Sequence, residues 1–280
     1  MSKSVFKYPG GKTQMFSWIE SFIKTHRTWV DVFGGSGVVT ANKDPSKVEV
    51  YNDLDGDIVH FFTTLRDNRK ELQEWLRATP HSRELHTKYA REFFDGERPT
   101  DDVERAGRFF YLRFTQFAAA YDSVSGYNGG ANTNSAVNSL HNATERLGRW
   151  QQRFRHVQVE QLDFTDLIDR YDTLETLFYA DPPYMDEGDV LYSHDGGFEH
   201  GRFVDTLLDT EGDWLVSYTR VPEPLREAAT CIVEQDRLVR MSQGQHESKR
   251  NTERLVMSYD PERVPMHSEE AQSTIGGWSE

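Results

Sequence analysis

Residues 177–184 read Leu-Phe-Tyr-Ala-Asp-Pro-Pro-Tyr, and they set the expectation for the rest of the chain. The five residues up to Asp181 predict a short apolar strand. The strand has to end there, because the two prolines that follow cannot donate to a sheet ladder. Its end presents a carboxylate, a prolyl carbonyl and the ring of Tyr184, which together can hold a planar ring that bears an amino group. The alternative is a Pro-Pro turn with Asp181 solvated at the rim.

An earlier strand ends in a glycine turn. Residues 28–33 predict this strand, which opens into Gly-Gly-Ser-Gly at 34–37 and then into an apolar helix start. A glycine turn between a strand and a helix lets a ligand approach the backbone closely, as in dinucleotide-binding folds. The Gly-x-Gly-x-x-Gly fingerprint is incomplete, because position 40 is Thr. The turn alone is therefore a weak signal, as often a plain turn as a site.

The next predicted strand, at 48–52, leads directly to Asp53. An acid at the tip of the second strand is where dinucleotide-binding folds hold ribose hydroxyls. Two further acids follow closely, and we expect Asp55 and Asp57 to cap the next helix.

The N-terminal segment contains a second glycine turn, since residues 5–12 read Val-Phe-Lys-Tyr-Pro-Gly-Gly-Lys. A phosphate-binding P-loop would need a glycine at position 6, which is Phe6, so that interpretation fails. A turn with Tyr8 and Lys12 on one side can still hold an anionic or aromatic ligand. The apolar spacing of residues 13–25 predicts a helix.

Length and composition indicate one large α/β domain or a domain with an inserted lobe, since the chain has 280 residues. The sequence contains no apolar run of 18 residues and begins with no signal peptide, so we expect a cytoplasmic protein without a membrane span. Its single cysteine, Cys231, fits a reducing compartment and is expected to be buried in a strand. The ten histidines show no metal-ligand spacing, so no metal site is expected.

The formal net charge is −14, which taken alone argues against nucleic acid as a partner. The 9 lysines are outnumbered by 23 arginines and accompany 46 acidic residues, a pattern that indicates a halophilic protein from a saline cytosol. In that setting net charge keeps the protein soluble, and the local distribution of charge decides which partners it binds.

Residues 67–156 form the most basic region of the chain. The pattern predicts helices over 69–95, 103–120 and 140–155, with a loop rich in Gly, Asn and Ser at 121–139. A loop of this length is either functional or disordered. The arginines of this region either form a solvated helix face or bind phosphate, and they include Arg105, Arg108, Arg113, Arg146, Arg149 and Arg153.

A strand at 157–160 is followed by Leu-Asp-Phe at 162–164, which begins a helix. Asp163 and Phe164 can grip an adenine, one at the exocyclic amine and one on the ring face. A helix N-cap is the competing interpretation of Asp163. The remaining prediction is an acidic loop at 185–201, helices at 202–209 and 223–228, a strand at 214–219, an antiparallel pair at 230–240 and 253–259, and a polar tail.

Four motifs occur in this order: Lys-Tyr-Pro-Gly-Gly-Lys, Asp-Val-Phe-Gly-Gly-Ser-Gly, Leu-Asp-Phe and Asp-Pro-Pro-Tyr. Together they resemble the α group of the DNA adenine-N6 methyltransferase family. The resemblance implies an α/β fold with a Rossmann-like methyltransferase sheet, formed by residues 1–66 and 157–262. An inserted, mainly helical target-recognition lobe would occupy 67–156, and a polar tail 263–280. The chain departs from the family at residues 111–114, where the family often has Tyr-Leu-Asn-Arg, and it lacks the basic hairpin of GATC-reading members.

The resemblance also implies a site for S-adenosyl-L-methionine. Its methionine end would lie among Tyr8, Gly10, Lys12, Phe33, Gly35 and Gly37. Asp53 would bind its ribose, Asp163 and Phe164 its adenine, and Asp181 would border the cofactor. The catalytic group would be Asp181, Pro182, Pro183 and Tyr184. DNA would be bound by the six arginines named above together with Tyr127 and Asn128.

The implied reaction is site-specific methylation of the N6 amino group of an adenine flipped out of double-stranded DNA. We expect a monomer, and the resemblance makes a cognate restriction endonuclease a candidate partner. Three alternatives stay open: the same chemistry on cytosine N4, on an adenine in RNA, or a catalytically silent viral decoy that binds DNA or cofactor.

Overall fold

The computed structural model describes residues 4–116, 126–129, 135–184, 197–239 and 249–263. Its contacts divide the chain into two compact units. The first unit comprises Met1–Gln14, Gly34–Asn42 and Tyr51–Gln161, and the second comprises Met15–Phe33, Lys43–Val50 and Leu162–Glu280. This division differs from the predicted domains, because it groups the two glycine turns with the insert; the functional boundaries at 67 and 156 stay a prediction.

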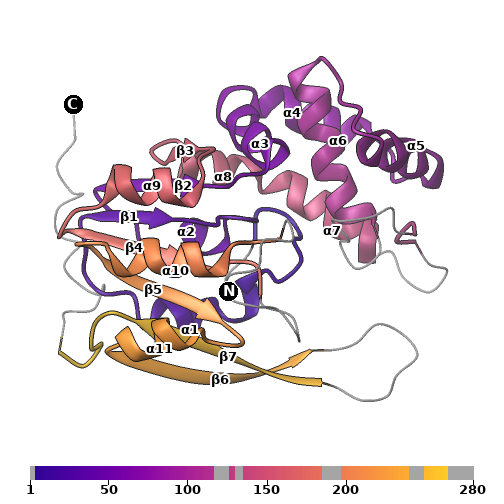
Figure 1. Ribbon diagram of the computed structural model, residues 1–280. Helices are drawn as coiled ribbons and strands as arrows, with labels where there is room; N and C mark the ends of the chain where they lie inside the picture. Colours follow the sequence, from indigo (N-terminus) through magenta and orange to yellow (C-terminus); the bar gives the residue numbers. More distant parts are fainter. Residues whose placement is uncertain (1–3, 117–125, 130–134, 185–196, 240–248, 264–280) are drawn as a thin grey trace, which may run out of the picture. The chain divides into compact units, whose positions relative to one another are not determined.

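Within the described residues, seven strands form one sheet in the order β3-β2-β1-β4-β5-β7-β6 (Figure 1). The strands are β1 Thr28–Asp31, β2 Val48–Asn52, β3 Gln158–Glu160, β4 Thr176–Ala180, β5 Asp213–Tyr218, β6 Cys231–Val239 and β7 Lys249–Met257. β4 pairs in parallel with β1 and β5, whereas β7 is antiparallel to β5 and β6. The expected α/β fold with a Rossmann-like sheet and a terminal antiparallel pair is confirmed.

The second unit buries its apolar residues between strands and three helices, α9 Phe164–Tyr171, α10 His200–Leu208 and α11 Glu223–Ala228. Every residue of β4 is buried, as expected for a central parallel strand that is covered on both faces. Cys231 begins β6 as expected but is partly exposed instead of buried.

The first unit has an aromatic core around α6 Asp102–Thr115, which packs against α3 Gly56–Asp67, α4 Arg69–Ala78, α5 Arg83–Phe94 and α7 Ser135–Glu145. The Phe110 ring stacks on Phe61 with centroids 5.4 Å apart, and Phe6 meets Phe109 edge-on at 5.3 Å. This unit also contains α2 Val38–Asn42, α8 Leu147–Phe154 and the 3-10 turn η1 Lys12–Gln14. No helix in the described ranges is long and apolar enough to cross a membrane.

Three helix predictions were wrong in extent. The helix expected over 13–25 is reduced to η1 and α1 Phe16–Glu20, where the Ser21 hydroxyl donates to the Trp18 carbonyl and competes with further helical bonds. The helix expected to reach 120 ends at Thr115, because Gln116 forms a β-bridge with Tyr127. The loops expected at 121–139 and 185–201 and the tail lie largely outside the described residues. Residues 135–139 are described and belong to α7, so a loop was wrongly expected there.

The third difference is a break between α7 and α8, where one helix over 140–155 was expected. The Gln73 side chain donates to the Thr144 carbonyl at 3.0 Å, and a continuous helix would offer that carbonyl to Gly148. The Thr144 hydroxyl in turn donates to the Leu140 carbonyl, a contact that bends helices. A long-range contact that the sequence pattern does not show therefore accompanies the break.

Candidate active site

Asp181 directly follows the last residue of β4, as the sequence predicted. In the sheet, Tyr179 of β4 is in register with Asp31 of β1 on one side and Leu215 of β5 on the other. Because the carboxyl ends of parallel strands meet at one edge of a sheet, Asp181 lies at the edge where such folds bind ligands. Asp181 is half-buried at this edge.

Tyr184 is fixed at the end of its side chain. Its hydroxyl donates to Glu253 Oε1 at 2.8 Å, and the Ser217 hydroxyl donates to the same carboxylate oxygen. Glu253 is only 2% exposed on β7. Burial, followed by the charges of Asp181 and Glu253, raises the pKa of Tyr184 well above its ordinary value, so the phenol stays protonated.

Two more buried phenols surround this strand end. Burial and then the charge of Asp181 raise the pKa of both Tyr179 and Tyr218. The Tyr218 hydroxyl lies 3.0 Å from His200 Nδ1. The strand end therefore combines carboxylates with neutral phenols, an environment that favours a bound group developing positive charge.

Asp163 acts as the N-cap of α9, since its Oδ1 accepts from the Thr165 amide at 3.0 Å. The N-cap interpretation is confirmed. Its other oxygen, Oδ2, accepts from Arg202 at 2.6 Å, and the Arg202 guanidinium lies 4.3 Å above the Phe164 ring. A cofactor adenine would have to share this carboxylate with Arg202, a residue whose place at the site the sequence pattern does not indicate.

Phe164 belongs to a cluster of four phenylalanines. Phe33 meets Phe198 and Phe203 edge-on, with 5.3 Å between centroids in both pairs, and its ring lies 6.1 Å from Phe164. Phe33 and Phe164 were predicted for the cofactor, and the structure brings them together. Phe198 and Phe203 were not singled out from the sequence, since isolated phenylalanines near a helix start indicate only core packing.

In the first unit, the glycine turn at 34–37 is held by backbone geometry that other residues rarely adopt. Gly35 and Gly37 have φ of +50° and +65°. A Cβ on Gly34 would lie 2.0 Å from the Tyr51 ring, and one on Gly37 would lie 3.0 Å from Phe154. Gly37 thus permits close packing against Phe154. A Cβ on Gly35 would lie 3.3 Å from the Tyr8 ring.

Asp53 connects the glycine turn to the tip of β2. Its Oδ2 accepts from the Gly35 amide at 2.8 Å, and its Oδ1 accepts from the Asp55 amide at 2.9 Å. Burial raises the pKa of Asp53 to about 6, although these two amides act in the opposite direction. The structure therefore brings Tyr8, Gly35 and Asp53 together. Of the other residues predicted for this end of the cofactor in the first unit, Gly10 is exposed and Lys12 is buried, with 2% of its surface exposed.

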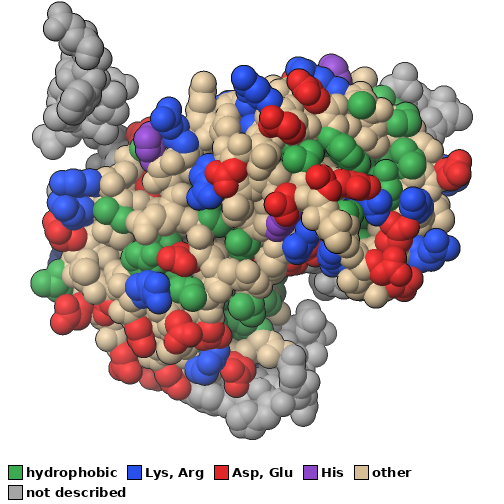
Figure 2. Space-filling view, turned by 90° about the horizontal axis from the view of Figure 1, so that it is seen from above, with side chains coloured by type: hydrophobic (Ala, Val, Ile, Leu, Met, Phe, Trp, Pro, Cys, Tyr) green, Lys and Arg blue, Asp and Glu red, His purple; other side chains and the backbone are tan. Residues whose placement is uncertain are grey.

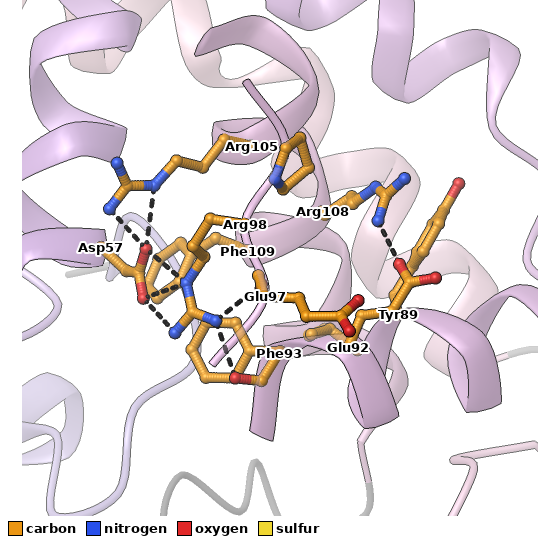
Figure 3. Close-up of a pocket in the computed structure, with 11 residues that line it drawn as sticks. Asp57, Tyr89, Glu92, Phe93, Glu97, Arg98, Arg105, Arg108 and Phe109 are labelled. Carbon is orange, nitrogen blue, oxygen red and sulfur yellow. Dashed lines mark hydrogen bonds and ion pairs between the residues drawn. The ribbon is translucent and has the colours of Figure 1, made fainter. Parts of the chain in front are cut away.

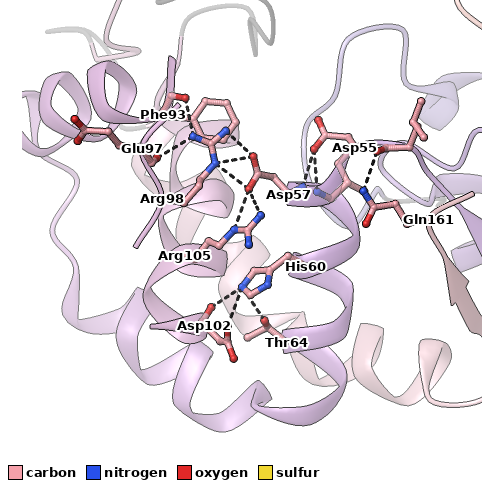
Figure 4. Close-up of polar contacts among 12 residues, drawn as sticks. Asp55, Asp57, His60, Thr64, Phe93, Glu97, Arg98, Asp102, Arg105 and Gln161 are labelled. Carbon is pink, nitrogen blue, oxygen red and sulfur yellow. Dashed lines mark hydrogen bonds and ion pairs between the residues drawn. The ribbon is translucent and has the colours of Figure 1, made fainter. Parts of the chain in front are cut away.

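Asp55 caps α3, as predicted, by accepting from the Asp57 amide at 2.7 Å. Asp57 does not cap the helix, contrary to expectation. Its carboxylate accepts from Arg98 at 2.8 Å and from Arg105 at 2.9 Å (Figure 4). Burial alone would raise the pKa of Asp57, but the two guanidinium groups lower it below its ordinary value.

The arginines of α6 make contacts inside the first unit, and these contacts do not favour the DNA role expected for them, which stays a prediction. Arg105 is bound to Asp57, and Arg108 pairs with Glu92 and with Glu104, the latter at 2.6 Å. Arg105, Arg108 and Glu92 line a small pocket together with Tyr89 and Phe93 (Figure 3). Arg113 is fully buried and donates to Gln116 at 2.9 Å, so its guanidinium is inaccessible to a phosphate.

The arginines around α8 differ from those of α6. Arg149 is exposed, with its guanidinium 5.0 Å above the Trp150 ring, and Arg146 and Arg153 are partly exposed. Burial and the nearby charge of Arg149 lower the pKa of Arg146. Across the face shown in Figure 2, acidic and basic side chains are interspersed.

Tyr127 and Asn128 are tied to the ends of α5 and α6. The Tyr127 hydroxyl contacts the His81 ring and donates to the His81 carbonyl at 3.1 Å, and Arg83 lies 4.7 Å above its ring. The backbone amide of Asn128 donates to the Thr115 carbonyl at 2.7 Å. Tyr127 therefore anchors this loop, and the Asn128 side chain is the better candidate for a base contact.

A parallel strand end that presents Asp-Pro-Pro-Tyr, on a sheet with an antiparallel β7, defines a Rossmann-like methyltransferase. Residues 8–201 match the family model of the D12 class N6 adenine-specific DNA methyltransferases, and the chain belongs to that family. It is an enzyme that methylates the N6 amino group of adenine, with DNA and a methyl donor as its substrates. The match gives no support to cytosine N4, to RNA or to a silent decoy.

Proposed function

We propose that the methyl donor is S-adenosyl-L-methionine and that the acceptor is an adenine flipped out of double-stranded DNA at a specific sequence. The family supplies the reaction, and the residues support the donor. A cofactor with a ribose, an adenine and a charged amino-acid end needs a carboxylate, an aromatic surface and an open backbone turn. In the first unit, the Asp53 carboxylate and the turn at Gly35 offer two of these features. In the second unit, the Phe33–Phe164 pair offers an aromatic surface.

Asp181 and the Pro182 carbonyl would accept the two hydrogens of the adenine amino group. An adenine amine is a poor nucleophile because its lone pair is delocalised into the ring. Acceptors on both hydrogens favour a pyramidal nitrogen and stabilise the positive charge that develops on it. When bound, the donor supplies an electrophilic sulfonium methyl group. The remaining rate enhancement comes from holding the amine in line with the methyl group that it attacks.

Tyr184 would stack on the flipped base. Flipping costs a few kcal/mol, and stacking on an aromatic ring recovers about 1–3 kcal/mol. The raised pKa of Tyr184 keeps the phenol neutral, so the ring adds no charge next to Asp181. Pro182 is buried and Pro183 exposed. Their rings restrict φ and so fix the backbone between Asp181 and Tyr184.

The DNA-binding surface of this proposal is smaller than the sequence indicated. Arg149, with Arg146 and Arg153, would contact phosphates, and Asn128 would contact bases. Arg105, Arg108 and Arg113 are left out because their guanidinium groups are engaged internally. A cognate restriction endonuclease and a monomeric state remain part of the proposal.

The observation that carries the proposal is the position of Asp181 at the end of β4 with Tyr184 held by Glu253. The test is calorimetric titration of the purified chain with S-adenosyl-L-methionine, followed by transfer of its labelled methyl group to unmethylated plasmid DNA. We expect binding and transfer by the natural chain. Asp181→Ala should retain most of the binding and lose transfer. Absence of S-adenosyl-L-methionine binding by the natural chain would contradict the assigned donor.

A further inference from the structure

Glu253 is a buried acid in the second unit. Glu253 is 2% exposed, and Leu255, Val256 and Met257 further along β7 are completely buried. Burying a carboxylate carries a large desolvation cost unless hydrogen bonds satisfy it. A buried carboxylate at this position therefore indicates a role for Glu253 beyond packing.

The hydrogen bonds of Glu253 lead to the catalytic tetrapeptide. Glu253 Oε1 accepts from the Tyr184 hydroxyl at 2.8 Å and from the Ser217 hydroxyl of β5. Tyr184 is thereby held at both ends, by the rigid backbone of Pro182 and Pro183 and by the carboxylate at the tip of its ring. A phenol held in this way cannot swing or tilt freely, and stacking on a base depends on the tilt of the ring.

The direction of the hydrogen bond is fixed by chemistry. Burial and the charges of Asp181 and Glu253 keep the Tyr184 phenol protonated, so the hydroxyl is the donor and the carboxylate the acceptor. A hydrogen bond to an ionised acceptor is about twice as strong as one between neutral groups. Glu253 is therefore suited to hold the ring, whereas an amide or hydroxyl at this place would hold it less firmly.

We propose that Glu253 is a positioning residue for methyl transfer: through its hydrogen bond to the Tyr184 hydroxyl it sets the orientation of the ring on which the flipped adenine stacks. This inference rests on the stacking role proposed for Tyr184. Because Glu253 acts through the Tyr184 ring in this proposal, its loss should slow transfer without weakening cofactor binding.

The decisive variants remove the two sides of the bond separately. Tyr184→Phe keeps the ring and removes the donor, Glu253→Leu removes the acceptor, and Glu253→Gln keeps an acceptor oxygen. Single-turnover transfer to unmethylated plasmid DNA should slow about tenfold in the first two variants. The double variant should be no slower than the slower single variant, because both changes break the same bond. Glu253→Gln should stay within about threefold of the natural chain, since a weaker hydrogen bond remains.

Rates are expressed per cofactor-binding site, counted by calorimetric titration, so that a loss of folded protein does not imitate a loss of rate. Glu49 is a matched control, because it is a second buried strand glutamate and binds Lys43 at 2.7 Å. Glu49→Gln should lower stability and leave the rate per site unchanged. If Glu253→Leu does not fold, Glu253→Gln replaces it, and should have no further effect in the Tyr184→Phe background.

An unchanged rate in Tyr184→Phe would overturn the inference, as would a double variant whose loss is the product of the single losses. Tyr184→Ala separates this failure from failure of the proposed function. A slow Tyr184→Ala beside a fast Tyr184→Phe would remove only the role of Glu253. Unchanged transfer in Tyr184→Ala would remove the stacking role itself.

Discussion

The Asp53 carboxylate accepts a hydrogen bond from the Gly35 amide at 2.8 Å, so that the tip of β2 holds the glycine turn that follows β1. Gly35 lies in the left-handed region, with φ of +50°, and its amide points at the carboxylate. Asp53 therefore has a structural task besides the ribose contact expected for it. Loss of the Asp53 carboxylate should therefore disturb the glycine turn and weaken ligand binding.

We expect Asp53→Ala to weaken binding of S-adenosyl-L-methionine about tenfold to a hundredfold, because a charged acceptor for ribose hydroxyls and the tether of Gly35 are both lost. Calorimetric titration at matched salt measures the change. Asp55→Ala is the control, since Asp55 caps α3 and its loss should cost about 1 kcal/mol of stability without changing affinity. Equal affinities of Asp53→Ala and the natural chain would mean that Asp53 only holds the glycine turn and does not bind the ribose.

The raised pKa of Asp53 predicts a pH dependence of stability. Folding raises the pKa from its ordinary value of 3.8 to about 6, so between these values the folded chain retains a proton that the unfolded chain has released. The contribution of Asp53 to the free energy of unfolding is present below about pH 4 and is lost as the pH rises to about 6. Denaturant unfolding measures the free energy of unfolding of the natural chain and of Asp53→Asn at each pH. The difference between the two free energies should change across this window and be constant above it. Parallel curves would contradict the shift.

Asp53 should also make cofactor affinity depend on pH with the opposite sign. Ribose hydroxyls donate to the ionised carboxylate, so affinity should fall as the pH falls below about 6. The affinity of Asp53→Asn should show no such step. Calorimetric titrations spanning roughly one pH unit on either side of this midpoint test the expectation. An affinity that changes equally with pH in both proteins would assign the step to another group.

Arg149 and Arg108 should differ in DNA binding although both lie in the basic insert. Arg149 is exposed, whereas Arg108 is paired with Glu92 and Glu104. Arg149→Ala should weaken binding to all sequences and reduce the slope of log affinity against log salt by about 1. Arg108→Ala should lower stability and leave that slope unchanged. A reduced slope for Arg108→Ala alone would reverse the assignment.

Asn128 should contribute to sequence preference. Its backbone is held by Thr115, and its partly buried side chain stands beside the anchored Tyr127. Asn128→Ala should relax the preference at one base position, costing about 1–3 kcal/mol of discrimination, and leave the salt slope unchanged. Sequencing of DNA methylated by each protein compares the two site preferences. Identical sites would place base reading elsewhere in the chain.

The fold could be predicted because short stretches with strong backbone requirements mark it. The prolines after Asp181 end β4, and the glycines at 34–37 begin a turn whose φ values only glycine adopts readily. The antiparallel pair of β6 and β7 followed from two predicted strands separated by a short polar segment. These features depend on neighbouring residues, which a sequence displays directly.

The site could be predicted only in part, because its remaining residues depend on partners distant in the chain. The internal pairing of Arg105 depends on Asp57, 48 residues earlier, and a basic helix face gives no sign of it. Arg113 is buried because α6 is surrounded by other helices. Glu253 reaches Tyr184 across 69 residues, and one acid beside Arg254 in a strand shows no sign of burial.

Adenine methylation through Asp181 is tested most directly by mass spectrometry of nucleosides from unmethylated double-stranded DNA incubated with the purified chain and S-adenosyl-L-methionine. We predict N6-methyladenine as the product, formed by the natural chain and absent with Asp181→Ala, whose cofactor binding persists. N4-methylcytosine in its place, or N6-methyladenine formed at the same rate by Asp181→Ala, would contradict this assignment.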